Sequence, residues 1–328
     1  MKSILAVLPA LTEEEKAEFK NTFPQCKVVF KAVNELTQEI VDSAQIIVGN
    51  IPNKFLHEQK IEFIQLTSAG ADDYVKPGIL DRSTILACCS GAYNRTVAEH
   101  AFATTLALQK NLFLYRDNQN QRCWADEGMV TSIEGSTVLV VGLGEIGKAY
   151  AKMAKALGAY VIGIKRRPGN KPEYVDEQYT AEQFETVVGR ADVIFSILPG
   201  TQATKHFYTI DRFKLMKNKA IFINCGRGSA VATDVLYEAL SNKMIRCAAI
   251  DVTEQEPLPS DSKLWSLKNL LITPHASGHY HLAETKGMVM DICENNLKAY
   301  LSGGEVKNIV DYETGYRKTS KESKLKQN

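Results

Sequence analysis

The sequence predicts an α/β protein made of two doubly wound parallel-sheet domains, one inserted into the other. Three observations lead to this prediction. Short apolar runs alternate with helical patterns over residues 1 to about 95, and a second, longer series of such runs begins at Ser136. The second series opens with a glycine-rich turn, VVGLGEIG, between a strand pattern and a helix pattern. One more helical pattern follows the last strand, as expected if the chain returns to its first domain.

Composition and charge restrict the class of partner. The chain has 328 residues, enough for about two domains. Hydrophobic residues make up 45% and charged residues 23%, which is usual for a globular protein, and the formal net charge is only +1. This balance creates no overall field that would attract nucleic acid or a membrane surface, and no apolar run approaches the ~18 residues of a membrane span. We therefore expect a small-molecule ligand, with neither nucleic acid nor a membrane as partner.

The seven cysteines indicate a reducing compartment. Their number is odd, no CxxC pair occurs, and no Cys/His cluster has zinc spacing. Cys88 and Cys89 are adjacent, and adjacent cysteines seldom form a relaxed disulfide. We expect reduced thiols, a cytoplasmic location and no bound metal.

The first series of apolar runs predicts a small parallel sheet. Its first run comes before Glu13, Glu14 and Glu15, which favours a strand followed by a helix over a signal peptide. After the series, from Thr96, apolar residues keep helical spacing for about six turns and predict one long helix that links the two domains. The expected strands of this sheet are SILAVL, AQIIVG, IEFIQLTS and TILACC.

The second series predicts a sheet of six strands separated by helical stretches, the arrangement of a Rossmann-type dinucleotide-binding domain. A final helical pattern, from about His281 to Leu301, is expected to pack on the first domain. The predicted domains are therefore a discontinuous substrate domain, residues 1–96 and 285–328, and a dinucleotide-binding domain, residues 97–284. The expected strands of the second sheet are TVLVVG, YVIGIK, DVIFSIL, AIFINC, RCAAIDV and NLLITP.

Three glycines form a GxGxxG pattern where the first strand of the second sheet passes into a helix. We expect Gly142 to make the tight turn, Gly144 to admit a pyrophosphate close to the backbone, and Gly147 to let the helix lie near the strand. Glu145 and Ile146 complete this turn, and N–H groups at the start of the helix would bind the diphosphate. The negative charge of Glu145 is unfavourable beside phosphate unless its side chain points outward.

The end of the next strand carries three cations, Lys165, Arg166 and Arg167. An acid at this place would accept hydrogen bonds from an adenosine ribose diol and favour NAD. Cations instead supply the donors that a 2′-phosphate needs. We therefore expect the chain to prefer NADP, with NAD still able to bind. The alternative is a solvated basic loop.

Three polar segments follow later strands of the second sheet: FINCGRGSAV, AIDVTEQEPLP and LLITPHASGHYH. The carboxyl ends of parallel strands meet at one edge of a sheet, and ligands bind at that edge, so we expect these segments to form one site. Their polar and glycine residues include Asn224, Gly226, Arg227, Asp251, Glu254, Glu256 and His275.

Several motifs occur together along nearly the whole chain, from about Leu5 to Asp311: LTSAGADD, VAEHAFATTLAL, GLGEIG, INCGRGSAV, DVTEQEP and TPHASG. In this order and spacing they resemble the D-isomer-specific 2-hydroxyacid dehydrogenases. The resemblance implies a flavodoxin-like substrate domain and hydride transfer between a nicotinamide cofactor and a small 2-oxo or 2-hydroxy acid, working mainly as a 2-oxoacid reductase. It also implies a homodimer.

The resemblance assigns catalytic roles to three residues. Arg227 resembles the group that binds the substrate carboxylate and carbonyl, Glu256 the acid that pairs with a histidine, and His275 the general acid/base. These residue types suit the chemistry, because a histidinium donates a proton near neutral pH and a neighbouring carboxylate favours and orients it. A guanidinium holds an anionic substrate and polarises its carbonyl.

The resemblance also implies binding residues around this triad. Backbone N–H groups of Ser68, Ala69 and Gly70 would bind the substrate carboxylate, together with Arg227 and His275. On the cofactor side, Leu198, Pro199 and Thr204 match the loop that covers the adenosine, and Asp251 matches the residue near the nicotinamide carboxamide. Asn224 and Gly226 are further cofactor residues.

Two other functions stay open. A formate dehydrogenase-like enzyme would share the fold, although such enzymes have Gln where this chain has Glu256. The alternative from another class is a corepressor-like binding module that senses the nucleotide. His100, in the predicted long helix, is expected to be structural. The candidates for lining the substrate pocket are Tyr74, Tyr93 and Tyr280.

Overall fold

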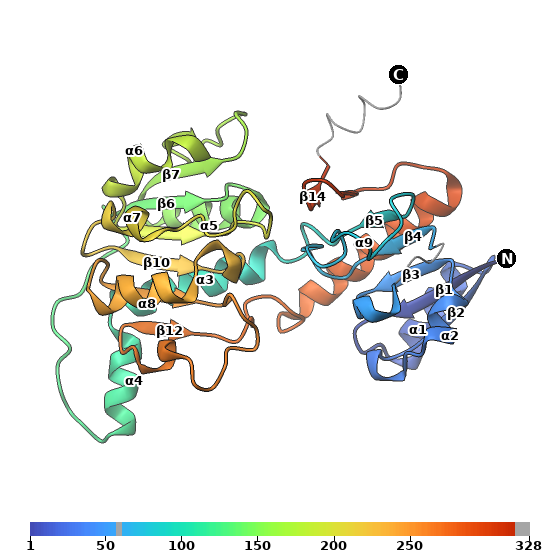
Figure 1. The fold of residues 1–328 in the computed structure, drawn as a ribbon, viewed down its shortest axis with the longest axis horizontal. Coiled ribbons are helices and arrows are strands. Elements are labelled where there is room, and N and C mark those ends of the chain that lie inside the picture. The colour runs from blue at the N-terminus through green and yellow to red at the C-terminus, as the bar shows by residue number, and fades with distance from the viewer. Residues whose placement is uncertain (57–60, 319–328) are drawn as a thin grey trace. The chain divides into compact units, whose positions relative to one another are not determined.

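The computed structural model describes residues 1–56 and 61–318, which form two compact units (Figure 1). Unit 1 comprises Met1–Tyr93 and Tyr280–Asn328, and unit 2 comprises Asn94–His279. Each unit is built around one parallel sheet with helices packed against it. The chain therefore passes from unit 1 to unit 2 and back. That the units serve as a substrate domain and a cofactor domain stays a prediction.

Unit 1 contains a five-stranded parallel sheet with the order β2-β1-β3-β4-β5. This is the flavodoxin-like order, which confirms the fold class predicted for the first domain. Strand β2 was not among the four predicted strands, and its side chains alternate between buried and less buried, as expected at a sheet edge. The strands are β1 (Lys2–Val7), β2 (Cys26–Phe30), β3 (Ile46–Gly49), β4 (Phe63–Gln65) and β5 (Ile85–Ala87).

The first helix of unit 1 begins with a capping box. In α1 (Glu13–Thr22), Thr12 Oγ1 accepts a hydrogen bond from the Glu15 N–H, and the Glu15 carboxylate accepts one from the Thr12 N–H. The acidic first turn of α1 also interacts favourably with the helix dipole. The short helices that follow are η1 (Val33–Glu35), α2 (Gln38–Asp42) and η2 (Asn53–Phe55).

Helix α9 (Ala283–Ser302) brings the C-terminal part of the chain back to unit 1, as the sequence predicts. Its Asn296 Nδ2 donates to Gln65 Oε1 of β4 at 2.7 Å, and both side chains are buried. Such a paired buried amide fixes the register of the helix on the sheet, because an unpaired one is unfavourable. An antiparallel hairpin follows, formed by β13 (Val310–Asp311) and β14 (Tyr316–Arg317).

Unit 2 contains a seven-stranded parallel sheet with the order β12-β11-β10-β9-β6-β7-β8. The order reverses between β6 and β9, which confirms the predicted Rossmann arrangement. The sequence prediction found six of these strands and missed β8, a polar edge strand whose four side chains are all half-buried. The strands are β6 (Thr137–Val141), β7 (Tyr160–Lys165), β8 (Glu177–Thr180), β9 (Val193–Ser196), β10 (Ile221–Asn224), β11 (Cys247–Ile250) and β12 (Leu270–Ile272).

The prediction of one long helix from Thr96 is wrong. The structure has two helices, α3 (Asn94–Gln109) and α4 (Leu112–Asn120), separated at Asn111, whose φ is 56°. Asparagine adopts this left-handed conformation more readily than most residues, and one such residue ends a helix. The helical spacing of apolar residues continues across the break, which is why the pattern did not reveal it.

The remaining helices of unit 2 connect consecutive strands of its sheet. The core they enclose is rich in aromatic residues, among them Tyr150, Phe195, Tyr208 and Phe222, none of which is measurably exposed. The connecting helices are α5 (Glu145–Ala156), η3 (Ala181–Gln183), α6 (Phe184–Val187), η4 (Val188–Arg190), α7 (Ile210–Lys214), η5 (Gly228–Ala230), α8 (Thr233–Ser241) and η6 (Lys263–Ser266).

The helices and the cysteines bear on membrane insertion and on disulfide bonds. Over residues 1–56 and 61–318, none of the helices combines the length and the apolar composition needed to cross a membrane. The seven cysteines are free thiols; Cys123 is exposed and the other six are buried.

Candidate active site

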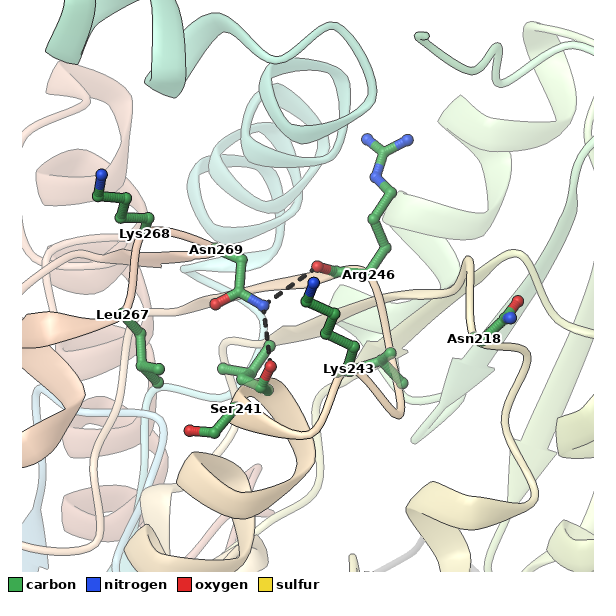
Figure 2. A pocket seen from close by; sticks show the side chains of 9 residues that line it. Asn218, Ser241, Lys243, Arg246, Leu267, Lys268 and Asn269 are labelled. Carbon is green, nitrogen blue, oxygen red and sulfur yellow. Dashed lines mark hydrogen bonds between the residues drawn. The ribbon is translucent and has the colours of Figure 1, made fainter. Parts of the chain in front are cut away.

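The polar segments singled out in the sequence gather at one edge of the seven-stranded sheet. The glycine turn follows β6, and the three polar segments follow β10, β11 and β12, so all four lie at carboxyl ends. A pocket of about 460 Å³ lies instead at the amino ends of β10, β11 and β12, where Lys243, Arg246 and Asn269 line it (Figure 2). Because ligands of such sheets bind outside the carboxyl ends, that pocket is not the candidate active site.

The glycine turn has the backbone that a bound diphosphate needs. Gly142 has a φ of +106°, and a Cβ there would lie 2.7 Å from the Ile197 carbonyl oxygen. A Cβ on Gly147 would lie 2.2 Å from the Gly142 carbonyl oxygen, so glycine lets α5 start close to β6. Gly144 is the N-cap of α5, which begins with Glu145 and the half-buried Ile146. The turn thus brings the N–H groups at the start of α5 next to glycines that have no side chains.

The charge of Glu145 is balanced within α5. Its carboxylate lies 3.2 Å from Lys148 Nζ, one turn along the helix, and the Glu145 side chain is 40% exposed. The pair therefore reduces the repulsion that Glu145 would exert on a phosphate in the turn.

The basic end of β7 is joined directly to the glycine turn. The N–H groups of Gly142 and Leu143 both donate to the Ile164 carbonyl oxygen, at 3.1 and 2.8 Å. Lys165, the last residue of β7, is half-buried, and Arg166 and Arg167 after it are exposed. The three cations consequently follow the strand that lies next to β6 in the sheet.

The loop after β9 is closed by its own threonines. Thr204 Oγ1 donates to the Pro199 carbonyl oxygen and accepts from the Thr201 N–H at 3.0 Å, which folds the segment that begins with Leu198. The same loop is held to the β11 loop by a pair that the sequence did not reveal. His206 Nε2 lies 2.7 Å from Glu254 Oε1.

Glu254 has a second partner besides His206. Its Oε2 accepts the Thr233 N–H at 3.0 Å, at the start of α8. Burial raises the pKa of Glu254, but the bonds from Thr233 and His206 outweigh this effect and hold the pKa below its usual value. Glu254 thus connects the loop after β9, the β11 loop and the start of α8.

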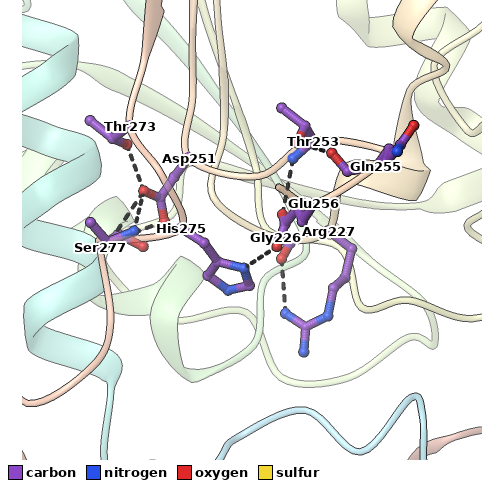
Figure 3. A network of polar contacts seen from close by, with 10 residues as sticks. Gly226, Arg227, Asp251, Thr253, Gln255, Glu256, Thr273, His275 and Ser277 are labelled. Carbon is purple, nitrogen blue, oxygen red and sulfur yellow. Dashed lines mark hydrogen bonds and ion pairs between the residues drawn. The ribbon is translucent and has the colours of Figure 1, made fainter. Parts of the chain in front are cut away.

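Arg227 is fixed by the residues around it at the end of β10. The buried Asn224 side chain donates to the Arg227 carbonyl oxygen at 3.1 Å and accepts the Gly226 N–H at 3.1 Å. The Arg227 guanidinium donates to the Gly226 carbonyl oxygen at 2.9 Å and is partly exposed. Figure 3 shows the guanidinium and the His275 imidazole extending from the same end of the network.

His275 and Glu256 form a pair, as their motifs predicted. His275 Nδ1 lies 2.7 Å from Glu256 Oε2, and the side chains are 48% and 38% exposed (Figure 3). Glu256 Oε1 accepts the Thr253 N–H at 3.0 Å, which orients the carboxylate. An imidazole held through Nδ1 by a carboxylate leaves its other nitrogen, Nε2, for proton transfer.

Asp251, at the end of β11, is buried beneath this pair. Its carboxylate accepts hydrogen bonds from Thr273 Oγ1 at 2.5 Å and from the N–H groups of Ala276 and Ser277 at 2.8 to 3.2 Å. His100 belongs to the same network, since its Nε2 lies 3.2 Å from Thr273 Oγ1. The structure thus gives His100 a contact with the loop that carries His275.

In unit 1 the segment Ser68–Gly70 follows β4 as a tight turn. Ser68 Oγ donates to the Gly70 carbonyl oxygen at 2.7 Å, and Ala69 at the tip is exposed. Asn50, which the sequence analysis did not single out, holds the turn from β3: its Oδ1 accepts the N–H of Thr67 at 3.0 Å and that of Ser68 at 3.4 Å.

Two of the tyrosines named as pocket candidates are buried. Tyr74 OH both donates to the Ile51 carbonyl oxygen and accepts the Ile51 N–H, at 2.9 Å each, and burial raises its pKa to about 12. Tyr93 OH donates to the Thr67 carbonyl oxygen at 2.7 Å. Both hydroxyls are therefore used inside unit 1.

Comparisons with known proteins identify relatives over nearly the whole chain. The family profile "D-isomer specific 2-hydroxyacid dehydrogenase, NAD binding domain" matches residues 102–277. Glyoxylate/hydroxypyruvate reductase B of Enterobacter sp. (strain 638) is 31% identical over 259 residues, 77% of this chain and 78% of that protein. A probable 2-ketogluconate reductase of Dictyostelium discoideum is 29% identical over 283 residues, 83% and 84% of the two chains.

The fold is also that of a solved relative. A D-isomer specific 2-hydroxyacid dehydrogenase family protein from Aeromonas salmonicida subsp. salmonicida A449 superposes with a TM-score of 0.81 at 29% identity, covering 95% of this chain and 99% of that one.

Proposed function

The chain belongs to the D-isomer specific 2-hydroxyacid dehydrogenase family, and we propose that it works mainly as a 2-oxoacid reductase with NADPH as its preferred cofactor. As a member of this family it is an NAD(P)-dependent oxidoreductase that acts on 2-hydroxy acids. The observation that supports the residue roles is the 2.7 Å pair of His275 and Glu256, which follows strand ends at the same edge of the sheet as Arg227. Unit 2 is then the cofactor domain and unit 1 the substrate domain.

The residues of unit 2 fit a nicotinamide dinucleotide. The glycine turn has a backbone that a side chain at Gly142 would obstruct, and it ends at the start of α5, where N–H groups face a diphosphate. We assign the remaining contacts to Gly144, Glu145, Ile146 and Gly147 in the turn, and to the loops after β9 and β10. The cofactor supplies the hydride that reduces C2 of the 2-oxo acid.

The chain's own side chains supply charge and a proton. Arg227 binds the substrate carboxylate and polarises the carbonyl whose oxygen gains negative charge as C2 is reduced. His275, as the imidazolium, then donates the proton on Nε2 to that oxygen, which completes the hydroxyl. Glu256 stabilises the imidazolium through Nδ1 and prevents the ring from turning. We assign further binding of the carboxylate to backbone N–H groups of the Ser68–Gly70 turn.

The basic triplet is the basis for the preference for NADPH. Lys165, Arg166 and Arg167 follow β7 directly beside the glycine turn, where the adenosine ribose of a bound dinucleotide would lie. A 2′-phosphate at this place gains charge-assisted hydrogen bonds that a ribose diol does not. NAD lacks that phosphate and is expected to bind more weakly.

We also propose that the protein is a cytoplasmic homodimer. The free thiols support a reducing compartment. The dimer rests on family analogy and on the helical region from α3, and two-fold dimers are the commonest of the closed soluble homo-oligomers in general. Sedimentation equilibrium at micromolar protein measures the assembly directly, and a mass equal to the 36.4 kDa of one chain would contradict the dimer.

Initial rates with a panel of 2-oxo acids test the proposed activity. The panel comprises glyoxylate, hydroxypyruvate, pyruvate, 2-oxoisocaproate and phenylpyruvate, each with NADPH and with NADH. We expect turnover of at least one acid and a higher kcat/KM with NADPH. Tight cofactor binding without turnover of any acid would instead support the nucleotide-sensing module, and faster turnover with NADH would contradict the assigned cofactor preference.

A further inference from the structure

The loop that carries His275 is bound to one buried acid. Three consecutive N–H groups of this loop donate to Asp251: that of His275 to the main-chain carbonyl oxygen at 2.7 Å, and those of Ala276 and Ser277 to the carboxylate. The Asp251 side chain is only 1% exposed. A buried carboxylate with this many donors is fixed in place, and it fixes the donors in turn.

The backbone conformation of the loop explains why an anion is needed there. His275 has a φ of 52°, in the left-handed region that residues other than glycine rarely adopt. Consecutive N–H groups beside a left-handed residue point into one concavity, which binds anions. In this loop the concavity is occupied by the chain's own Asp251 carboxylate, which compensates for the unfavourable conformation of His275.

Two side chains outside the loop hold the carboxylate. The Thr273 hydroxyl has one proton and gives it to Asp251 Oδ1 at 2.5 Å, so its oxygen must accept the bond to His100 Nε2 at 3.2 Å. His100 is therefore the donor, and the bonds run in one direction, from His100 through Thr273 to Asp251. His100 Nε2 also lies 3.9 Å from Asp251 Oδ1, so the imidazole on α3 contacts both the Thr273 hydroxyl and the carboxylate that this hydroxyl binds.

Helix α3 binds the loop at a second point. Thr96 Oγ1 donates to the Ser277 carbonyl oxygen at 3.0 Å. Thr96 and His100 are four residues apart and so lie on one face of the helix. The first turns of α3 thus hold both ends of the segment Thr273–Ser277, with His275 between them.

We propose that Asp251, held by Thr273 and His100, is a positioning residue that keeps the His275 loop in the left-handed conformation and so aims the imidazole at Glu256 and the substrate. This inference rests on the proposed function, because it concerns the residue that donates the proton. It assigns to Asp251 a role other than the contact with the nicotinamide carboxamide that the family resemblance implied.

The two roles of Asp251 use different oxygen atoms, so they can be separated. Oδ1 accepts from Thr273, Ala276 and Ser277, whereas Oδ2 accepts from Ser277 alone. A carboxylate has about four acceptor sites on its two oxygens, so a donor from the cofactor would be accepted by Oδ2, which accepts fewer hydrogen bonds than Oδ1. A substitution at Thr273 therefore weakens the positioning role and leaves a contact between Oδ2 and the cofactor intact.

The test compares Thr273→Val with Thr273→Ser in the full chain. Valine keeps the size of the side chain and removes the hydroxyl, and we expect kcat for 2-oxoacid reduction to fall on the order of tenfold to a hundredfold, the size of one hydrogen bond to a charged group. The Kd for NADPH, measured by fluorescence titration, is expected to stay within about twofold of the wild-type value, since Oδ2 is untouched. Serine keeps the hydroxyl and is expected to restore kcat.

A matched control is available on α3. Thr104 is also buried, but its hydroxyl donates to the Ala101 carbonyl oxygen within the helix at 2.9 Å, away from the loop. Thr104→Val is therefore expected to keep the wild-type kcat. Should Thr273→Val not fold, His100→Phe removes the donor at the start of the relay, and a fall in kcat at unchanged Kd for NADPH is again expected.

Three results would overturn the inference: a wild-type kcat in Thr273→Val, a loss of NADPH binding that matches the loss in kcat, or no recovery with serine. Each of these requires a wild-type protein that reduces a 2-oxo acid. A wild-type protein without such activity would overturn the proposed function itself, so the two failures are distinguishable.

Discussion

Replacing Glu256 by glutamine tests the proposed acid/base pair most directly, because it keeps the size of the side chain and removes its charge. Glu256 Oε1 accepts the Thr253 N–H at 3.0 Å, and Oε2 bonds His275 Nδ1 at 2.7 Å. The Thr253 N–H still needs an acceptor in the variant, so the glutamine oxygen takes the place of Oε1 and the amide NH2 faces Nδ1. A donor at that position favours the neutral imidazole over the imidazolium.

The size of this effect follows from the exposure of the pair. A hydrogen bond to a charged group contributes roughly 1.5–3 kcal/mol. The His275 and Glu256 side chains are 48% and 38% exposed, and solvent screening weakens a pair of this kind. We therefore expect the lower end, about 1.5 kcal/mol, which corresponds to a rate change of roughly tenfold. Reduction uses the imidazolium that Glu256 stabilises, so kcat for reduction in Glu256→Gln is expected to fall roughly tenfold.

The assay is kcat for reduction of a 2-oxo acid that the wild-type protein turns over, measured with saturating NADPH. Glu254→Gln is the matched control, since Glu254 lies in the same loop but bonds His206 and Thr233 instead of His275. The control is expected to keep the wild-type kcat. A wild-type kcat in Glu256→Gln, or an equal fall in Glu254→Gln, would refute the assigned role of Glu256.

Three further predictions follow from the site. His275→Ala is expected to lower kcat by ~10²–10⁴-fold with little change in the Kd for NADPH, because it removes the proton donor and no cofactor contact; undiminished turnover would place the donor elsewhere. Arg166→Ala is expected to raise KM for NADPH on the order of tenfold to a hundredfold and to leave KM for NADH nearly unchanged, and equal changes would contradict a 2′-phosphate contact. The pKa of Glu254 lies below its usual value, so its stabilising effect is present above about pH 4.5 and is lost as the carboxylate is protonated in acid. Glu254→Gln is therefore expected to show a smaller acid-induced fall in Tm than the wild-type protein, and parallel Tm curves would count against the clamp.

Most strands could be predicted from the sequence because parallel strands are buried on both faces and so appear as short apolar runs. The run TVLVVG contains all of β6, in which four of five residues are buried. Burial also explains why two strands were not predicted. The edge strands β2 and β8 are covered on fewer sides, and β8, with the sequence EQYT, has no apolar run. Its place in the sheet is set by pairing with β7, which is a tertiary contact and not a local pattern.

The break between α3 and α4 could not be predicted for a related reason. Hydrophobic spacing reports only where apolar residues recur, and Leu112, Phe113 and Leu114 continue the recurrence past Asn111 although none of the residues of α4 is buried. The left-handed conformation is confined to the single residue Asn111, and the pattern of neighbouring side chains does not predict it. Spacing therefore identified helical segments correctly but not the point at which one ends and the next begins.

Motifs predicted which residues of the site share one region, but not the hydrogen-bond partners of each atom. Because parallel strands end at one edge of a sheet, the sequence alone predicted that Arg227, Glu256 and His275 lie in the same region. They could not identify the partners of each atom, because the donors on Asp251 include backbone N–H groups, and His100 lies 173 positions from Thr273 in the chain. The motif implied a cofactor contact at Asp251, but it did not indicate that Oδ1 of this carboxylate already accepts hydrogen bonds from other residues of the chain. Oδ1 accepts hydrogen bonds from the loop that carries His275, and we infer that the first requirement on an acid at this position is the conformation of that loop. A contact with the cofactor would then use Oδ2.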